Sequence, residues 1–128
     1  MESSTVSAVL FAKNMKRVAA FYAQALGLTC TASDEHHSAL NGYGFHLIVH
    51  QISQPIADGI TIRQPPERRV WGAIRLNFPV QSIEDSRRAA KSLGGVVDDA
   101  PPEWADRHAN FFLGHDPEGN VFGASQQA

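Results

Sequence analysis

The sequence predicts an α+β fold in which two βαβββ modules form one domain of 128 residues. The prediction depends on two stretches that resemble each other. In each, an apolar run ends at a phenylalanine, a polar residue suited to cap a helix follows, and a helical pattern leads to Leu-Gly. The phenylalanine and the leucine are 15 residues apart both times, from Phe11 to Leu26 and from Phe78 to Leu93. Matched spacing of this kind indicates an internal repeat.

Each predicted helix has start and stop signals. Asn14 and Ser82 can accept hydrogen bonds from the N–H groups of a first helical turn. Gly27 and Gly94 supply the left-handed residue that commonly ends a helix. The first helix has one apolar stripe at helical spacing, formed by Met15, Val18, Ala19, Tyr22, Ala25 and Leu26.

Three short strands are expected after each helix. Their ranges are 29–33, 38–41 and 44–51 in the first half, and 95–98, 109–114 and 121–125 in the second. Turn formers, Asn41-Gly42 and Asp116-Pro117-Glu118-Gly119-Asn120, precede the last strand of each half.

These elements divide the single domain, residues 1–128, into two modules and a linker. Module 1 covers about residues 5–51, the linker 52–70 and module 2 about 71–126. The linker contains three arginines, and we expect these side chains to be solvated.

Composition and charge exclude several classes of function. The chain is 43% hydrophobic and 19% charged, and its net charge of −2 gives no general attraction to nucleic acid or to anionic membranes. The single cysteine, Cys30, excludes a disulfide framework and is expected to be buried. No apolar run approaches the roughly 20 residues of a membrane span, and no signal peptide is visible. We therefore expect a cytoplasmic protein whose partner is a small molecule.

The paired modules resemble the vicinal oxygen chelate superfamily. The features that carry the resemblance are Phe-Tyr-x-x-x-Leu-Gly-Leu at the end of the first helix, residues 21–28, and the late Asp-Pro-Glu-Gly-Asn. That group includes glyoxalase I, bleomycin-resistance proteins, fosfomycin-resistance enzymes and extradiol dioxygenases. The resemblance covers essentially the whole chain. It implies a glyoxalase-like incomplete barrel around a central cavity, and it implies a homodimer.

Metal-dependent members of this superfamily carry a ligand, typically His or Glu, on the first and last strands of each module. The resemblance puts these positions at Ser7, His46, Arg75 and Gly123. Of these side chains only the imidazole of His46 is a competent ligand, and the permanent cation of Arg75 repels a metal. Because a catalytic zinc site needs about three protein ligands, we predict no metal and no cofactor.

The predicted ligand-binding residues are Ser7, His46, His50, Arg75 and Asn77, with His46 and Arg75 as catalytic candidates. On a strand, His46 and His50 share a face at about 13 Å, too far apart to bind one ion. His46 either lines the cavity, where it can act as a general base, or is a structural residue. Arg75 either binds an anionic group in the cavity or forms a salt bridge or a surface contact.

Other aromatic and histidine residues have open interpretations. Trp104 and His108 flank a loop that could cover the cavity mouth as an aromatic lid. Trp71 is expected to pack between modules or subunits, and His36 and His37 to be solvent-exposed.

Two classes of function remain open. The first is a metal-free protein that binds a small organic molecule, such as an anion, as the resemblance to bleomycin-resistance proteins implies. The second is an enzyme of lyase, isomerase or dioxygenase type that uses Arg75 and a cavity histidine, or a metal held at an unrecognised site. The identity of the ligand cannot be read from the sequence.

Overall fold

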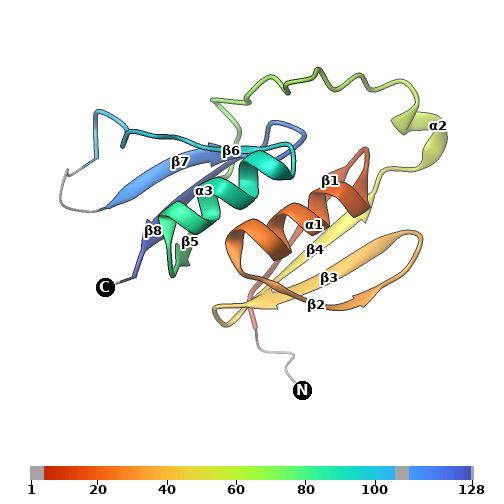
Figure 1. The fold of residues 1–128 in the computed structure, drawn as a ribbon. Coiled ribbons are helices and arrows are strands. Elements are labelled where there is room, and N and C mark those ends of the chain that lie inside the picture. The colour runs from red at the N-terminus through yellow and green to blue at the C-terminus, as the bar shows by residue number, and fades with distance from the viewer. Residues whose placement is uncertain (1–4, 106–109, 128) are drawn as a thin grey trace.

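Each half of the chain forms a four-stranded sheet with one helix on one of its faces (Figure 1). The computed structural model describes residues 5–105 and 110–127. The first half contains β1 (Ser7–Ala12), α1 (Met15–Leu26), β2 (Thr29–Ser33), β3 (His37–Gly42) and β4 (Phe45–Gln51). A short helix, α2 (Gln54–Ala57), lies in the linker. The second half contains β5 (Leu76–Val80), α3 (Ile83–Ser92), β6 (Val96–Val97), β7 (Phe111–His115) and β8 (Val121–Gln126).

The strand order confirms the predicted βαβββ repeat. Sheet A has the order β1-β4-β3-β2, and sheet B has the equivalent order β5-β8-β7-β6. In both sheets the first and last strands of the module are parallel neighbours, and the other pairs are antiparallel. Within the described residues the sheets stay separate and form no closed barrel.

The helix caps are those that the sequence predicts. The Asn14 side chain accepts from the Arg17 N–H, and the Ser82 hydroxyl accepts from the Asp85 N–H at 3.1 Å. Gly27 has a φ of 82°, the left-handed conformation that ends α1.

A glutamine at the end of each module links its last strand to the start of its helix. Gln51 Oε1 accepts from the Met15 N–H at 3.0 Å, and Gln126 Oε1 accepts from the Ile83 N–H at 2.8 Å. Each bond satisfies one of the N–H groups that a first helical turn leaves without an intrahelical partner. Sequence reasoning missed this pair, because glutamine at a strand end has no local signal.

The two modules share one hydrophobic core. The helices α1 and α3 pack side by side, each also covering the inner face of its own sheet (Figure 1). Tyr22 of α1 packs against Phe78 and Phe122 of sheet B, with ring centroids 5.9 and 6.3 Å away. Module 1 therefore supplies part of the core of module 2.

The turn between β7 and β8 connects the modules through two carboxylates. Asp116 is fully buried and accepts from the Tyr22 hydroxyl at 2.8 Å. It also accepts from the backbone N–H of Glu118 at 2.8 Å and from the backbone and side chain of Asn120. Glu118 accepts from the backbone N–H groups of Lys13 and Asn14, at 2.9 and 2.7 Å.

The structure corrects several local predictions. Strand β5 begins at Leu76, so Arg75 precedes the strand instead of lying on it, and Ile74 is 80% exposed. The turn before β4 is centred on Tyr43 and Gly44, both with positive φ, because Gly42 still belongs to β3. Cys30 is exposed, since β2 is an edge strand whose residues are all exposed.

Two further observations concern exposure and length. Trp71 is 95% exposed and does not pack between the modules. No helix in the described residues has the length and apolar character of a membrane span.

We predict that Asp116→Ala lowers the free energy of unfolding by about 3–5 kcal/mol in urea denaturation. The substitution leaves several buried donors without an acceptor, at roughly 1–3 kcal/mol for each unsatisfied group. Tyr22→Phe removes only one of these bonds and is expected to cost about 1–2 kcal/mol. Asp85→Ala, an exposed acidic control on α3, should change stability by less than about 0.5 kcal/mol. Equal effects of the Asp116 and Asp85 variants would contradict the role of the buried carboxylate.

Candidate functional site

Arg75 is exposed just before the first strand of sheet B, and it contacts one amide and two aromatic rings. Its Nε donates to Asn77 Oδ1 at 3.0 Å. Its guanidinium carbon lies 5.4 Å from the ring centroids of both Trp104 and Phe111, within the range of a cation–π contact. The two rings are themselves 5.8 Å apart. We call these four residues the Arg75 cluster.

The glycine at position 123 makes room for this cluster. Gly123 of β8 is the Cα partner of Asn77 in β5. A Cβ atom at Gly123 would collide with Asn77 Oδ1 and with the ring of Phe111. The position that the resemblance assigns to a metal ligand therefore serves here to let two other side chains lie across the strand.

His46 lies on sheet A, between polar neighbours on the adjacent strands. Its Cα partners are Ser7 in β1 and Asn41 in β3. The Asn41 side chain donates to the Thr31 hydroxyl at 2.7 Å. Leu47 and Val49 of β4 face the core. His46 alternates with them along the strand, so it lies on the opposite face of sheet A, which we call the open face.

His50 shares the open face of sheet A with His46, as predicted, but its neighbours differ. Its ring centroid lies 5.6 Å from that of Phe11 and 6.2 Å from that of His37. Ile48 lies between the two histidines on this face, and four residues of strand separate them by about 13 Å, so their rings do not meet.

Four of the five predicted ligand-binding residues form two pairs, and His50 lies apart from both. Ser7 and His46 are neighbours on sheet A, and Arg75 and Asn77 are hydrogen-bonded on sheet B. A cleft of about 160 Å³ lies where the modules meet, smaller than the usual 300–1,000 Å³ of a ligand pocket. Its lining is mostly apolar and consists of Ala8, Val9, Leu10, Tyr22, Leu47, Ile74, Leu76, Asn120, Val121 and Phe122.

The side chains at the four superfamily positions do not fit a metal ion. They are the hydroxyl of Ser7, the imidazole of His46 and the guanidinium of Arg75, while Gly123 has no side chain. A single imidazole competes poorly with water for a divalent ion. Within residues 5–105 and 110–127, no three His, Cys, Asp or Glu side chains are grouped so as to hold an ion.

A second arginine, Arg68, connects the linker to the end of sheet B. Its two Nη atoms donate to the two carboxylate oxygens of Asp98 at 2.8 and 2.7 Å, and its Nε donates to His115 Nδ1 at 2.8 Å. This contact corrects the expectation that all three linker arginines are solvated. It needs a neutral His115, since only the deprotonated Nδ1 can accept.

The electrostatics of His115 favour its neutral form. The residue is 8% exposed, and its Nε2 has no hydrogen-bond partner among the described residues. Burial and then the Arg68 cation lower the pKa of His115 below 6.5, and the Asp98 carboxylate offsets this only in part. The hydrogen-bond partner of His115 is 47 residues away in the chain.

The sequence offers Arg75 and Asn77 as candidates but does not indicate that two rings contact Arg75. Trp104 was considered only as one side of a lid, and it contacts Arg75 and Phe111. The alternation along β7 could have indicated Phe111, because it shares a sheet face with Leu113. His108, the other flank of the expected lid, lies outside the described residues.

Comparison with known proteins finds one matching family and several solved structures with a similar fold. The sequence profile of a family described as a glyoxalase-like domain matches residues 7–124. No curated protein sequence matches the chain. Among solved structures, an integron cassette protein from the mobile metagenome of V. cholerae is 19% identical, with 98% of this chain and 96% of that chain covered and a TM-score of 0.63.

Two further solved structures have similar scores. A glyoxalase/bleomycin resistance protein from Albidiferax ferrireducens is 18% identical, with 98% of this chain and 100% of that chain covered and a TM-score of 0.62. A genomically encoded fosfomycin resistance protein from Listeria monocytogenes is 16% identical, with 100% and 94% covered and a TM-score of 0.64. At these identities the likeness shows a shared fold.

We predict that acid destabilises the protein through His115. Because the pKa of His115 in the folded chain is lower than 6.5, the unfolded chain takes up the proton first as the pH falls. The stabilisation by neutral His115 is complete above about pH 6.5 and is lost progressively below it. Urea denaturation between pH 7.5 and 5.5 should therefore show a falling free energy of unfolding.

The matched variant is His115→Gln, whose amide oxygen can still accept from Arg68 but does not titrate. Its loss of stability over this pH interval should be smaller than that of the unmodified protein. His36→Gln removes a histidine whose side chain is 75% exposed, and it should leave the pH dependence unchanged. The same pH dependence in the His115 variant and the unmodified protein would show that other groups control acid unfolding.

Proposed function

We propose that this chain, which belongs to the glyoxalase-like domain family of the vicinal oxygen chelate superfamily, binds a small organic anion through Arg75 and uses no metal at the superfamily positions. One observation carries the proposal: the guanidinium of Arg75 is positioned by Asn77 and two aromatic rings at the start of sheet B. A cation held in this way is preorganised for an anion.

The chemistry of the cluster indicates the class of ligand. The bond to Asn77 uses Nε, and a guanidinium has four further N–H groups on its two Nη atoms. Those groups match the paired oxygens of a carboxylate or phosphonate. Trp104 is 64% exposed and offers a flat apolar surface beside the cation. An anion with a planar apolar part would use both features.

A second candidate function is catalysis, of lyase, isomerase or dioxygenase type. The observation in its favour is His46, which lies on the open face of sheet A between Ser7 and Asn41. An imidazole in such a position can act as a general base. Solved structures with the same fold are named as a dioxygenase family enzyme and as a fosfomycin resistance protein. In this alternative, Arg75 stabilises negative charge that develops on the substrate.

We also propose that the chain works as a homodimer in the cytoplasm, with no nucleic acid or membrane partner. Large apolar side chains are exposed along β1 and before β5, and each of these strands is one edge of its sheet. Phe11 is 61% exposed, Trp71 95% and Ile74 80%. A second copy that covers these side chains would enclose the open sheet faces and complete a ligand cavity larger than the cleft within one chain.

Arg75→Ala is expected to weaken the binding of benzoate and phenylphosphonate about tenfold or more in calorimetric titration. A charge-assisted hydrogen bond contributes about 1.5–3 kcal/mol, and tenfold corresponds to about 1.4 kcal/mol. Arg75→Lys should bind with intermediate affinity, because it keeps the charge and loses the planar fork. Benzamide, a neutral isostere, should bind more weakly than benzoate to the unmodified protein.

The control for this titration is Arg88→Ala, which removes an exposed arginine of α3 and should leave binding unchanged. Unaltered affinity of the Arg75→Ala variant for both anions would exclude the proposed function. If a substrate is found, His46→Ala distinguishes the alternatives. Turnover that is lost while binding persists would support the enzyme, and turnover that persists would exclude His46 as the base.

Light scattering at micromolar concentration should give twice the chain mass of 13.9 kDa. Ile74→Glu places a charge in the proposed contact and should yield the monomer. Ile56→Glu, a matched substitution at an exposed isoleucine of α2, should leave the dimer intact. A monomeric unmodified protein would contradict the proposed assembly.

A further inference from the structure

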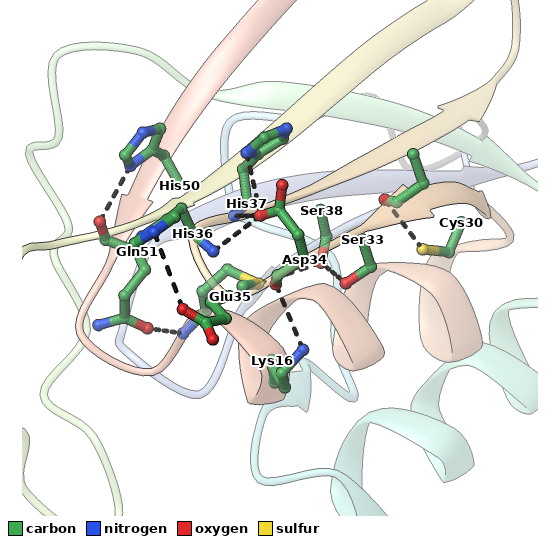
Figure 2. Close-up of polar contacts among 12 residues, drawn as sticks. Lys16, Cys30, Ser33, Asp34, Glu35, His36, His37, Ser38, His50 and Gln51 are labelled. Carbon is green, nitrogen blue, oxygen red and sulfur yellow. Dashed lines mark hydrogen bonds and ion pairs between the residues drawn. The ribbon is translucent and has the colours of Figure 1, made fainter.

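Two histidines form a cross-strand pair that has no part in the proposed function. His37 of β3 and His50 of β4 are direct Cα partners in the antiparallel ladder. Their rings lie 6.2 Å apart between centroids, and the ring planes differ by only 18°. Figure 2 shows both rings on one side of the strands, with α1 on the other. The pair therefore lies on the open face of sheet A.

Each ring has an oxygen beside Nδ1. His50 Nδ1 lies 2.9 Å from the backbone carbonyl oxygen of Gln51. A carbonyl can only accept, so Nδ1 carries the proton and Nε2 carries the lone pair. His37 Nδ1 lies 3.3 Å from Asp34 Oδ1. This carboxylate favours a proton on the same nitrogen of His37, and it leaves Nε2 as the nitrogen that can bind a metal.

The position of Asp34 is itself fixed. Its Oδ1 accepts from the backbone N–H groups of His36 and His37, at 2.8 and 2.9 Å (Figure 2). These hydrogen bonds lower the pKa of the Asp34 carboxyl, which keeps it anionic. A histidine that binds a metal through one nitrogen typically donates its other N–H to a carboxylate or a backbone carbonyl. The pair contains one example of each.

We propose that His37 and His50 form a binding site for one divalent transition-metal ion, with Nε2 of each ring as a ligand. Zinc–nitrogen bonds of about 2.0–2.1 Å require the two Nε2 atoms to be about 3.3 Å apart in a tetrahedral site. In this structure the two rings are stacked with centroids 6.2 Å apart, so the His37 ring, whose side chain is 46% exposed, must turn toward His50 for both Nε2 atoms to reach one ion. Imidazole ligands select Zn²⁺ or Cu²⁺ over Mg²⁺ and Ca²⁺.

The site is separate from the four superfamily positions. His46 is four residues from His50 on the same strand, about 13 Å away, and cannot bind the same ion. Phe11 packs against His50 with its ring centroid at 5.6 Å, which limits the movement of that ring. With two protein ligands, the other coordination positions are left to water or to an external ligand. The ion is therefore exchangeable.

The test is a calorimetric titration of the full-length, tag-free and metal-stripped protein with ZnCl₂. One ion per chain should bind, and MgCl₂ should give no signal. His37→Gln and His50→Gln should each weaken zinc binding by about tenfold or more, because each removes one of two ligands. Asp34→Asn keeps an oxygen that accepts from the backbone and loses the charge, and it should weaken binding by about tenfold.

Two histidine controls distinguish this site from others. His36→Gln removes the adjacent exposed imidazole, and His46→Gln removes the imidazole at the superfamily position. Both variants should bind zinc as the unmodified protein does, and the melting temperatures of all variants should be the same. Zinc binding that is lost in His46→Gln would overturn the proposal. Unaltered affinity in the double variant His37→Gln/His50→Gln would do so as well.

Discussion

A buried carboxylate, Asp116, is the interaction on which the arrangement of the two modules depends. It accepts from Tyr22 of module 1 and from three donors within its own turn. Burial raises the pKa of Asp116, and the donors from Asn120, Glu118 and Tyr22 partly offset that effect. An unsatisfied group in this position is costly, so the modules stay together only in the orientation that keeps every bond. The Tyr22 ring then completes the core of sheet B.

The same turn also positions the linker. The Arg69 N–H donates to the Gly119 carbonyl at 2.8 Å, and a Cβ at Gly119 would collide with the Glu67 carbonyl. Arg68 is therefore directed to Asp98 and His115 at the end of sheet B. One motif thus determines the path of the chain between the modules as well as their contact.

The two modules have the same backbone plan and different chemistry on their open faces. Gln51 and Gln126 occupy equivalent places, each bonded to the first turn of its own helix. On sheet A the open face carries imidazoles, whereas on sheet B it carries one cation beside two rings that contact each other. Repetition preserved the contacts that hold each helix to its sheet. The side chains on the opposite face are free of that constraint, so they can diverge toward different ligands.

Local signals predicted what depends on near neighbours in the chain. The caps at Asn14 and Ser82, the glycine that ends α1, and the shared face of His46 and His50 follow from hydrogen bonding and alternation within a few residues. The exposure of Cys30 was missed, because apolar character alone does not show that a strand lies at the edge of a sheet. The start of β5 at Leu76 was missed, because apolar residues can precede a strand without pairing in the sheet.

By itself, the sequence determined the two modules, their helices and the identity of the residues at the superfamily positions. Only the tertiary structure decided which side chains meet. Trp104 and Phe111 flank Arg75, and His37 stands beside His50, because sheet pairing and the core bring distant segments together. Contacts of this kind depend on register between strands, which no local pattern specifies to better than a residue. A shift of one residue would place Phe111, His37 or His50 on the opposite face of its sheet.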